Sequence, residues 1–215
     1  MSLLITAFGR FMGGPNCSQI LLKALAAERA ELERIWRAPI TLEVLPVDVE
    51  AVRPALERLL RMAAPSHLLL MGQAGARDAI CLERKARNHI DLGVPDAAGR
   101  LGPLGPVIAG GPDQMLANWP DPEGVVAAVK AAGAPARLSD DAGGHLCNQT
   151  LYLALEAAGK AAGGSLVATF LHLPLLPEQI AAGVPAAQGA GCSVALDDMK
   201  RAVRAILRHT RETAV

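Results

Sequence analysis

A thiol stands where a glycine turn leads into a segment with helical periodicity. Residues 143–150 read GGHLCNQT, so that two glycines precede Cys147, and the sequence LYLALEAAGKAA follows. The unpaired N–H groups in the first turn of a helix carry a partial positive charge, which favours a thiolate over a thiol. A buried cysteine that only fills space is the ordinary alternative. Position alone therefore makes Cys147 a candidate nucleophile that needs partners.

Three further cysteines compete with Cys147 for this role. Cys17 is the strongest rival, because it also opens a predicted helix after a Gly-rich loop. Cys81 has no glycine turn before a helix, and Cys192 lies in GAGCS, which could be a turn or a loop. The four cysteines form no CxxC pair and no zinc-type spacing, so the pattern favours free thiols over a metal site.

A thiol nucleophile requires a base that also returns the proton to the leaving group, and histidine is suited to both tasks. His172 lies at the carboxyl end of a predicted strand at 165–173, and Cys147 follows a predicted strand at 135–140. If these strands are neighbours in a parallel sheet, both side chains open onto one edge, although a histidine bonded to backbone is the ordinary alternative. His67 begins a strand and belongs at the opposite edge. The remaining histidines lie in loops or on the last helix: His89, His145 and His209.

A histidine base in turn needs an acceptor that orients its ring. The segment GQAGARDAICLERKARN, residues 72–88, supplies Asp78 and Glu83. Glu83 stands in a charged run, for which a solvated surface is the ordinary explanation. The residue pattern by itself leaves the choice of acceptor open.

The elements that must position these residues alternate between strands and helices. Apolar runs predict strands at 3–8, 40–47, 67–72, 135–140 and 165–173, and helical periodicity predicts helices at 17–37, 49–64, 120–133, after Cys147, and at 194–212. Such alternation predicts one α/β domain over residues 1–215, with a mostly parallel sheet and helices on both faces. The segment 83–110 gives no clear pattern.

Composition narrows the class of protein. The chain has 215 residues, half of them hydrophobic and only 3% aromatic, so its core must consist of Ala, Leu, Val and Ile. Lys and Arg balance Asp and Glu at 21 each, which leaves no net charge to attract nucleic acid or an anionic membrane. No secretory signal pattern and no apolar run long enough to cross a bilayer stand out, so we expect a cytoplasmic protein with reduced cysteines.

Taken together, the motifs resemble those of the pyroglutamyl peptidase I family, also called pyrrolidone-carboxylate peptidases. ITAFGRFMGGPNCS is similar to the family's TGFxPFGGxxxNPS, and LLMGQAGARDAICLERKARN to VGQAGGRxxITPERVAxN. DAGGHLCNQTLY resembles AGTFVCNHLxY, and FLHLPLLPEQ resembles FIHVPxxPEQ. VPD and GGP stand where the family has IPD and GP. The pieces follow one another in family order along nearly the whole chain.

The resemblance implies a cysteine peptidase that removes N-terminal pyroglutamate (5-oxoproline) from peptides through a thioester. Its triad maps onto Glu83, Cys147 and His172. The implied fold is a three-layer α/β/α sandwich. The family uses no metal and no organic cofactor, and it often assembles as a tetramer, so we expect a homo-oligomer. The loop FLHLPLLPEQI, with several large apolar residues, is the expected interface.

Pyroglutamate carries no free amine, so its pocket needs an apolar slot and a few hydrogen bonds rather than an acidic residue. Phe8, Phe11 and Leu146 are expected to form this slot, and Gln73 or nearby backbone is expected to supply polar contacts. The backbone N–H groups at the start of the helix, including that of Cys147, are expected to receive the oxyanion.

Several positions depart from the family pattern. Leu82 replaces the proline of PER, and Arg10 replaces a proline of the opening motif. Gly93 replaces an arginine before IPD, and His145 with Leu146 replaces Phe-Val before the cysteine. The loss of an aromatic wall and of a long cation predicts a more polar pocket and weaker hydrolysis of pyroglutamyl amides.

Two alternatives remain open from sequence. Gly93 and His145 favour a diverged cysteine hydrolase that acts on another small cyclic or N-acyl amide. The Gly-Gly-Pro loops FMGGP and AGGPD would suit a non-catalytic α/β protein that binds phosphate, although neither has Walker or dinucleotide spacing. A single hyper-reactive cysteine would distinguish an enzyme from such a binding protein.

Overall fold

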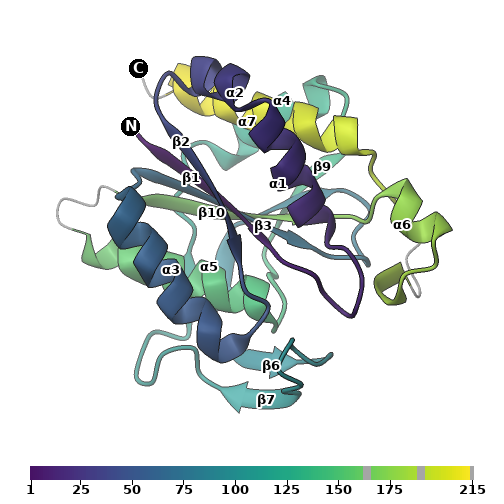
Figure 1. Ribbon diagram of the computed structural model, residues 1–215. Coiled ribbons are helices and arrows are strands. Elements are labelled where there is room, and N and C mark those ends of the chain that lie inside the picture. The colour runs from purple at the N-terminus through teal and green to yellow at the C-terminus, as the bar shows by residue number, and fades with distance from the viewer. Residues whose placement is uncertain (162–165, 188–191, 214–215) are drawn as a thin grey trace.

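The computed structural model describes residues 1–161, 166–187 and 192–213. In these ranges the chain forms a six-stranded sheet with the order β2-β1-β3-β10-β4-β9 (Figure 1). The strands are β1 (Leu3–Phe8), β2 (Ile40–Leu45), β3 (His67–Gln73), β4 (Ile80–Glu83), β9 (Ala136–Ser139) and β10 (Val167–Leu173). Among the described strands of this six-stranded sheet, neighbours pair in parallel, except that β4 runs antiparallel to β10. The prediction of a mostly parallel α/β sheet is confirmed.

The apolar runs of the central strands bury both faces of the sheet. In β1, Leu3 and Ile5 belong to one buried cluster, whereas Leu4 and Phe8 belong to another. Successive side chains of a strand point to opposite faces, so the two clusters lie on opposite sides of the sheet. A strand that is buried on both faces must be apolar throughout, which is why LLITAF and HLLLMG lack polar alternation.

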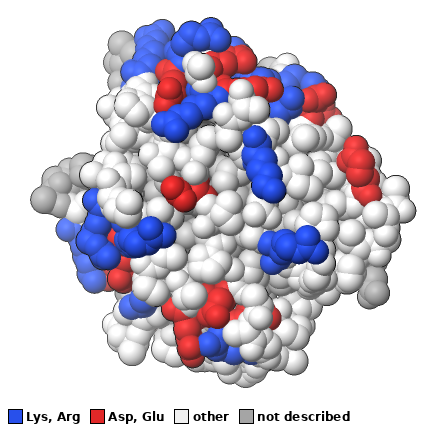
Figure 2. Space-filling model, viewed as in Figure 1, with Lys and Arg blue, Asp and Glu red and all other residues white. Residues whose placement is uncertain are grey.

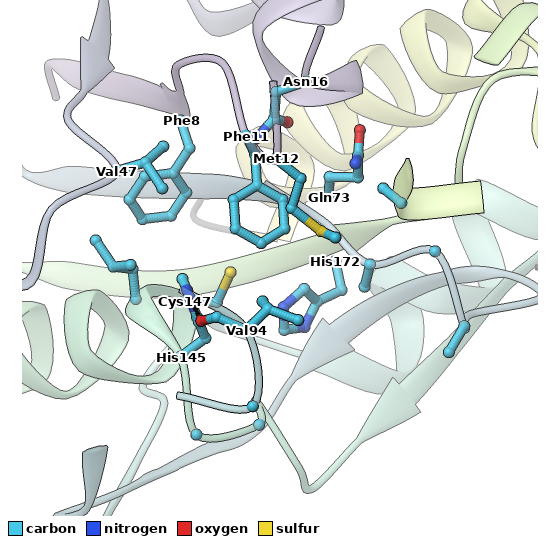
Figure 3. A pocket seen from close by; sticks show the side chains of 18 of the residues that line it. Phe8, Phe11, Met12, Asn16, Val47, Gln73, Val94, His145, Cys147 and His172 are labelled. Carbon is cyan, nitrogen blue, oxygen red and sulfur yellow. Dashed lines mark hydrogen bonds between the residues drawn. The ribbon is translucent and has the colours of Figure 1, made fainter. Parts of the chain in front are cut away.

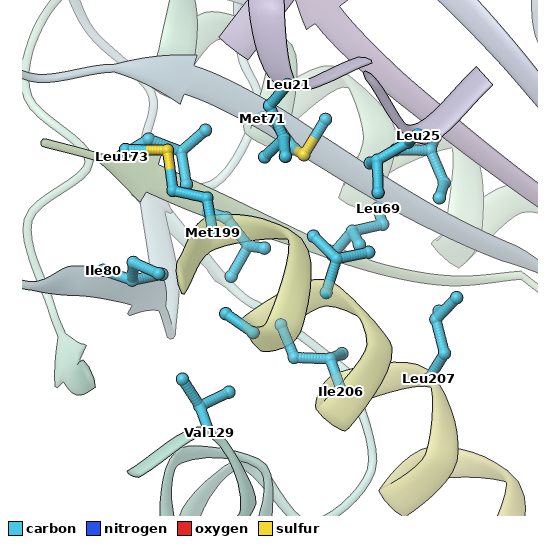
Figure 4. Packing of buried hydrophobic residues seen from close by; sticks show 14 of the residues in the cluster. Leu21, Leu25, Leu69, Met71, Ile80, Val129, Leu173, Met199, Ile206 and Leu207 are labelled. Atoms are coloured by element: carbon cyan, nitrogen blue, oxygen red, sulfur yellow. The ribbon is translucent and has the colours of Figure 1, made fainter. Parts of the chain in front are cut away.

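Helices cover both faces and complete the predicted three-layer α/β/α sandwich (Figure 1). On one face lie α1 (Cys17–Ala27), α2 (Arg29–Trp36), α4 (Pro122–Ala131) and α7 (Leu196–Thr213), and on the other lie α3 (Val49–Ala63) and α5 (Leu146–Lys160). Figure 4 shows the first cluster, in which Leu21 of α1 and Ile206 of α7 pack with Met71 of β3.

The helix predicted at 17–37 is divided into two. At Glu28 the backbone leaves helical geometry, with φ −108° and ψ 17°, and α2 begins at Arg29. Glu28 lies between the two helices, and its carboxylate forms ion pairs with Lys200 and Arg204 of α7. These ion pairs connect the junction of α1 and α2 to the last helix. Figure 2 shows the resulting mixture of basic and acidic side chains over α2 and α7, where charge is balanced locally.

The segment 83–110, which gave no pattern, contains strands too short for one. β5 (Lys85–Arg87) pairs with β8 (Gln114–Leu116), and β6 (Ile90–Leu92) pairs with β7 (Gly102–Gly105), both outside the main sheet. Three or four residues cannot establish an alternation of apolar and polar side chains. The pair β6–β7 extends away from the body of the sheet at the bottom of Figure 1.

The prediction that FLHLPLLPEQI presents an exposed apolar surface is wrong. Leu173, Leu175 and Leu176 are all buried. Leu173 ends β10, and Leu175 and Leu176 lie between it and the short helix α6 (Pro177–Ala181), which a 3-10 turn at Pro185–Ala187 follows. The segment is apolar because it belongs to the core.

Some boundaries also shift. β10 begins at Val167 rather than at residue 165, which lies outside the described residues, as do the first three residues of GAGCS. Within the described ranges, none of the helices is both long and apolar enough to cross a membrane.

Candidate active site

An open pocket of about 590 Å³ lies over β3 and β10, beside the start of α5 (Figure 3). Six of the seven residues predicted for the site line it: Phe8, Phe11, Gln73, Leu146, Cys147 and His172. The seventh, Glu83, is fully buried behind His172. The structure therefore brings all the predicted residues together.

The route by which they meet differs from the prediction. The strands that precede Cys147 and His172 are not neighbours, because β4 lies between β9 and β10. β9 also runs antiparallel to β10, since it is parallel to β4. The loop after β9 must therefore return toward the end of β10 before α5 begins at Leu146. The inserted strand was missed because its four residues are followed by a run of charged side chains.

The inserted strand supplies the acceptor for His172. In the antiparallel register Glu83 stands opposite Phe170, two residues before His172 on β10. Opposite residues share a face of the sheet, as do residues two apart on a strand, so Glu83 and His172 lie on one face. The Nδ1–H of His172 donates to Oε1 of Glu83 at 2.8 Å. Asp78, the other candidate acceptor, is largely exposed and pairs with Arg137 at 3.0 Å instead.

Arg77 is a site residue that sequence reasoning missed. Its Nη2 lies 3.4 Å from Oε1 of Glu83 and donates to the carbonyl oxygen of Asp141 at 2.5 Å. A buried carboxylate is costly unless cations or donors compensate it, and Arg77 provides a second partner for the same oxygen that His172 uses. Arg77 also lines the pocket. Only the fold shows which of the many arginines lies beside Glu83.

The N-terminus of α5 holds Cys147 in its first turn. Cys147 is the second residue of the helix, and within the described residues its N-cap, His145, makes no side-chain capping hydrogen bond. By contrast, the side chains of Asn16, Asp48 and Asp121 cap α1, α3 and α4. The first N–H groups of a helix have no partner inside it, so those around Cys147 remain to bind an oxyanion.

Gly72 is what allows the sulfur to approach the sheet. A Cβ atom at this position of β3 would lie 2.8 Å from Sγ of Cys147 and 2.7 Å from Cζ of Phe170. Any side chain here would displace the sulfur of Cys147 or the aromatic ring of Phe170. The requirement was not foreseen, because it depends on contact between two distant segments.

The charge of His172 depends on its two neighbours. Burial acts to lower the pKa of His172, but the sulfur of Cys147 and the carboxylate of Glu83 outweigh burial and raise the pKa to about 9. At neutral pH the imidazole of His172 is therefore protonated beside the sulfur of Cys147.

The other thiols lack such an environment. Cys17 is fully buried, and burial raises the pKa of its thiol, so it stays protonated. Cys81 is also buried, and its sulfur accepts from Nε of Arg137 at 3.3 Å. Cys192 is exposed. Cys81 pairs with His172 across β4 and β10, but of the four cysteines Cys147 is the one whose sulfur raises the pKa of His172.

The walls of the pocket combine apolar and polar groups. Phe8 and Leu146 are buried at its floor, and Phe11 meets the ring of His145 edge-on, with centroids 5.3 Å apart. Gln73 is held in a fixed orientation because its Oε1 accepts from the backbone N–H of Cys17 and from Nε2 of Gln179, each at 2.9 Å. Among the described residues no hydrogen bond is recorded for its Nε2, which can therefore donate to a ligand.

His145 and Gly93 make the wall more polar and more open than an aromatic side chain and an arginine would. The Nε2 of His145 lies 3.2 Å from the carbonyl oxygen of Val94, which can only accept, so Nε2 carries the proton and Nδ1 is an acceptor. Burial lowers the pKa of His145, which keeps the ring neutral. A Cβ atom at Gly93 would meet no atom within 4 Å, so this side of the pocket is empty space. In the described ranges, no three His, Cys, Asp or Glu side chains are grouped to hold a metal ion.

Comparisons with known proteins agree with this geometry. A family model described as pyroglutamyl peptidase matches residues 1–212. The pyrrolidone-carboxylate peptidase of Thermococcus onnurineus is 36% identical over 83% of this chain and 86% of its own length. That of Cupriavidus pinatubonensis is 34% identical over 100% of this chain and 94% of its own. The crystal structure of pyrrolidone carboxyl peptidase from Pyrococcus furiosus superposes with a TM-score of 0.87 at 27% identity and covers both chains fully.

The raised pKa of His172 predicts an alkaline limit to activity. The protonated ring can give its proton to a leaving amine, whereas the neutral ring cannot. We expect kcat/KM to fall about tenfold per pH unit as the pH rises beyond about 9. Initial rates at subsaturating substrate across the alkaline range measure the limit, and a midpoint near neutrality would contradict it.

The protonation of His172 should also contribute to the free energy of unfolding. This contribution is fully present below the unfolded pKa of 6.5 and is lost as the pH rises through about 9.

Proposed function

The chain belongs to the pyroglutamyl peptidase family and is a cysteine peptidase that removes N-terminal pyroglutamate, and we propose that Cys147, His172 and Glu83 are its catalytic residues. The observation that carries the proposal is the buried 2.8 Å bond between Nδ1 of His172 and Glu83, on an imidazole whose charge responds to the sulfur of Cys147. The comparisons give no support to another cyclic amide as substrate or to a non-catalytic binding protein.

The pocket suits a neutral five-membered lactam. Phe8, Phe11 and Leu146 present apolar surface to the ring, and burying that surface favours binding. The Nε2 of Gln73 can donate to the lactam carbonyl, and Nδ1 of His145 can accept from the lactam N–H.

Acylation begins when Sγ of Cys147 attacks the carbonyl carbon that joins pyroglutamate to the next residue. A bond forms between sulfur and carbon, and the carbonyl oxygen becomes an oxyanion, which the N–H groups at the start of α5 receive. His172 then gives its proton to the amide nitrogen as the C–N bond breaks, so the shortened peptide leaves as a neutral amine.

Deacylation uses the same groups in reverse. The neutral His172 takes a proton from water, whose oxygen attacks the thioester carbon and releases free pyroglutamate and the Cys147 thiolate. Glu83 fixes the ring and stabilises its charged form throughout, and Arg77 keeps that carboxylate in place.

We further propose a single peptidase domain, located in the reducing cytoplasm and assembled as a homo-oligomer, with a tetramer as the finer expectation. Both buried clusters pack on one sheet, which supports one domain. The four cysteines, all in described ranges, are free thiols, which suits a reducing compartment.

Replacement of Glu83 by Gln should lower kcat by roughly 10²–10⁴, because an amide orients the imidazole without stabilising its charge. The matched control is Asp78→Asn, which removes an exposed carboxylate on the same segment and should leave kcat little changed. Stopped assays on a fluorogenic pyroglutamyl amide measure both variants, and circular dichroism checks their folding. Wild-type turnover from folded Glu83→Gln would show that another group orients His172.

Stoichiometric iodoacetamide should alkylate Cys147 first and abolish activity, because an imidazolium-paired thiolate reacts faster than a buried thiol. Peptide mapping of the labelled protein identifies the site. Cys192→Ser is the control, since it removes an exposed thiol and should change neither the rate of inactivation nor turnover. Inactivation that tracks a label on Cys17 or Cys81 would reject Cys147 as the nucleophile.

The proposed homo-oligomer should be visible in light scattering at micromolar concentration. Exposed apolar side chains support it: Leu101 and Leu104 beside or on β7, and Leu116 on β8, are 58%, 42% and 70% exposed. Burying such side chains between copies would remove apolar surface from water. We therefore propose that the interface involves the exposed leucines at β7 and β8 and not the buried segment after β10. A monomeric mass would contradict the proposal.

A further inference from the structure

The loop after β1 holds a backbone conformation that its residue disfavours. Phe11 and Gly14 exchange two backbone hydrogen bonds, of 3.1 and 3.0 Å, across Met12 and Gly13. Both central residues have positive φ, 50° and 73°, as in a type I′ turn, which favours Asn followed by Gly. Met is a poor residue for this conformation because its Cβ crowds the backbone. Strain of this kind at a pocket points to a role for the side chain.

The Met12 side chain lies at the mouth of the pocket. Figure 3 shows it beside Phe11, with its thioether toward Gln73 and His172. It is 38% exposed, a large apolar group left partly in water, whereas Phe8 and Leu146 below it are almost fully buried. Met12 therefore forms part of the rim, while the other two form the floor.

The structure of the substrate determines which of its parts lies against Met12 at the rim of the pocket. The nitrogen of pyroglutamate is closed into the lactam, so the peptide continues from the ring in one direction only. The ring therefore occupies the closed end of the pocket, and the residue after it passes out through the mouth. A second hollow of about 530 Å³ shares Phe11, Met12 and Val47 with the pocket and is also lined by Pro95 and Pro185.

We propose that Met12 is a specificity-determining residue, which provides an apolar platform for the side chain of the residue that follows pyroglutamate. The inference rests on the proposed function of the pocket. A thioether is flexible and polarizable, so it adapts to apolar side chains of different shape. The enzyme is thereby selective for peptides whose second residue is apolar, and the strained turn is retained because it holds this side chain over the exit.

The test uses the matched substrates pyroglutamyl-glycine amide and pyroglutamyl-leucine amide. Wild type should show the larger kcat/KM on the leucine substrate. Met12→Asn suits the type I′ turn and removes the apolar group, so it should lower kcat/KM about tenfold on the leucine substrate, as loss of a hydrophobic contact does, and little on the glycine substrate. Met12→Leu keeps both the strain and the apolar surface, and it should retain the preference.

Stability separates this role from a structural one. Met12→Asn should melt at or above the wild-type temperature, because it relieves the turn. An unchanged ratio of the two substrates in Met12→Asn, or an equal loss on both, overturns the proposal while leaving the peptidase function intact. A fall in melting temperature together with lost activity also overturns it. A wild-type enzyme that hydrolyses neither substrate contradicts the proposed function itself.

Discussion

The buried hydrogen bond between Glu83 and His172 is the constraint on which the site depends. A carboxylate with no exposed surface destabilises the fold unless cations or donors compensate it. His172 and Arg77 do so at Oε1 of Glu83, whereas Oε2 has no hydrogen-bond partner among the described residues. The antiparallel insertion of β4 beside β10 brings the two side chains to one face. The sheet therefore departs from parallel order at the point where the chemistry needs a carboxylate, and the loop after β9 has to carry Cys147 back to the same edge.

The position of Cys147, the proposed nucleophile, depends on a second close approach, between β3 and α5. Gly72 leaves room for Sγ of Cys147, and the uncapped start of α5 leaves its N–H groups for the oxyanion. Most strands carry a side chain at a position such as Gly72, and most helices have a capping side chain at a position such as His145. A glycine inside a strand, a helix without a side-chain cap and the positive φ of Met12 are each locally unfavourable. The large apolar clusters on both faces of the sheet stabilise the fold that holds them.

The parts of the fold that sequence predicted are those with long, strong patterns. The buried runs of β1 and β3 and the start of α5 could be read directly, and family-like motifs pointed to Glu83. The short strand β4 could not be read, because four residues carry too little periodicity, and its direction depends on pairing across the chain. The burial of the segment after β10, the contact of Arg77 with Glu83 and the space at Gly72 arise only once distant segments meet. Apolar composition alone could not distinguish that buried segment from an exposed interface.

The most direct test of this account is a crystal structure of the enzyme with a pyroglutamyl aldehyde, which a thiolate converts to a thiohemiacetal. We expect a bond from Sγ of Cys147 to the aldehyde carbon and the new oxygen within hydrogen-bonding distance of the N–H groups at the start of α5. The lactam ring should lie between Phe8, Phe11 and Leu146. His172 should remain bonded to Glu83. An adduct on another cysteine, or a lactam ring outside this slot with Cys147 unmodified, would contradict it.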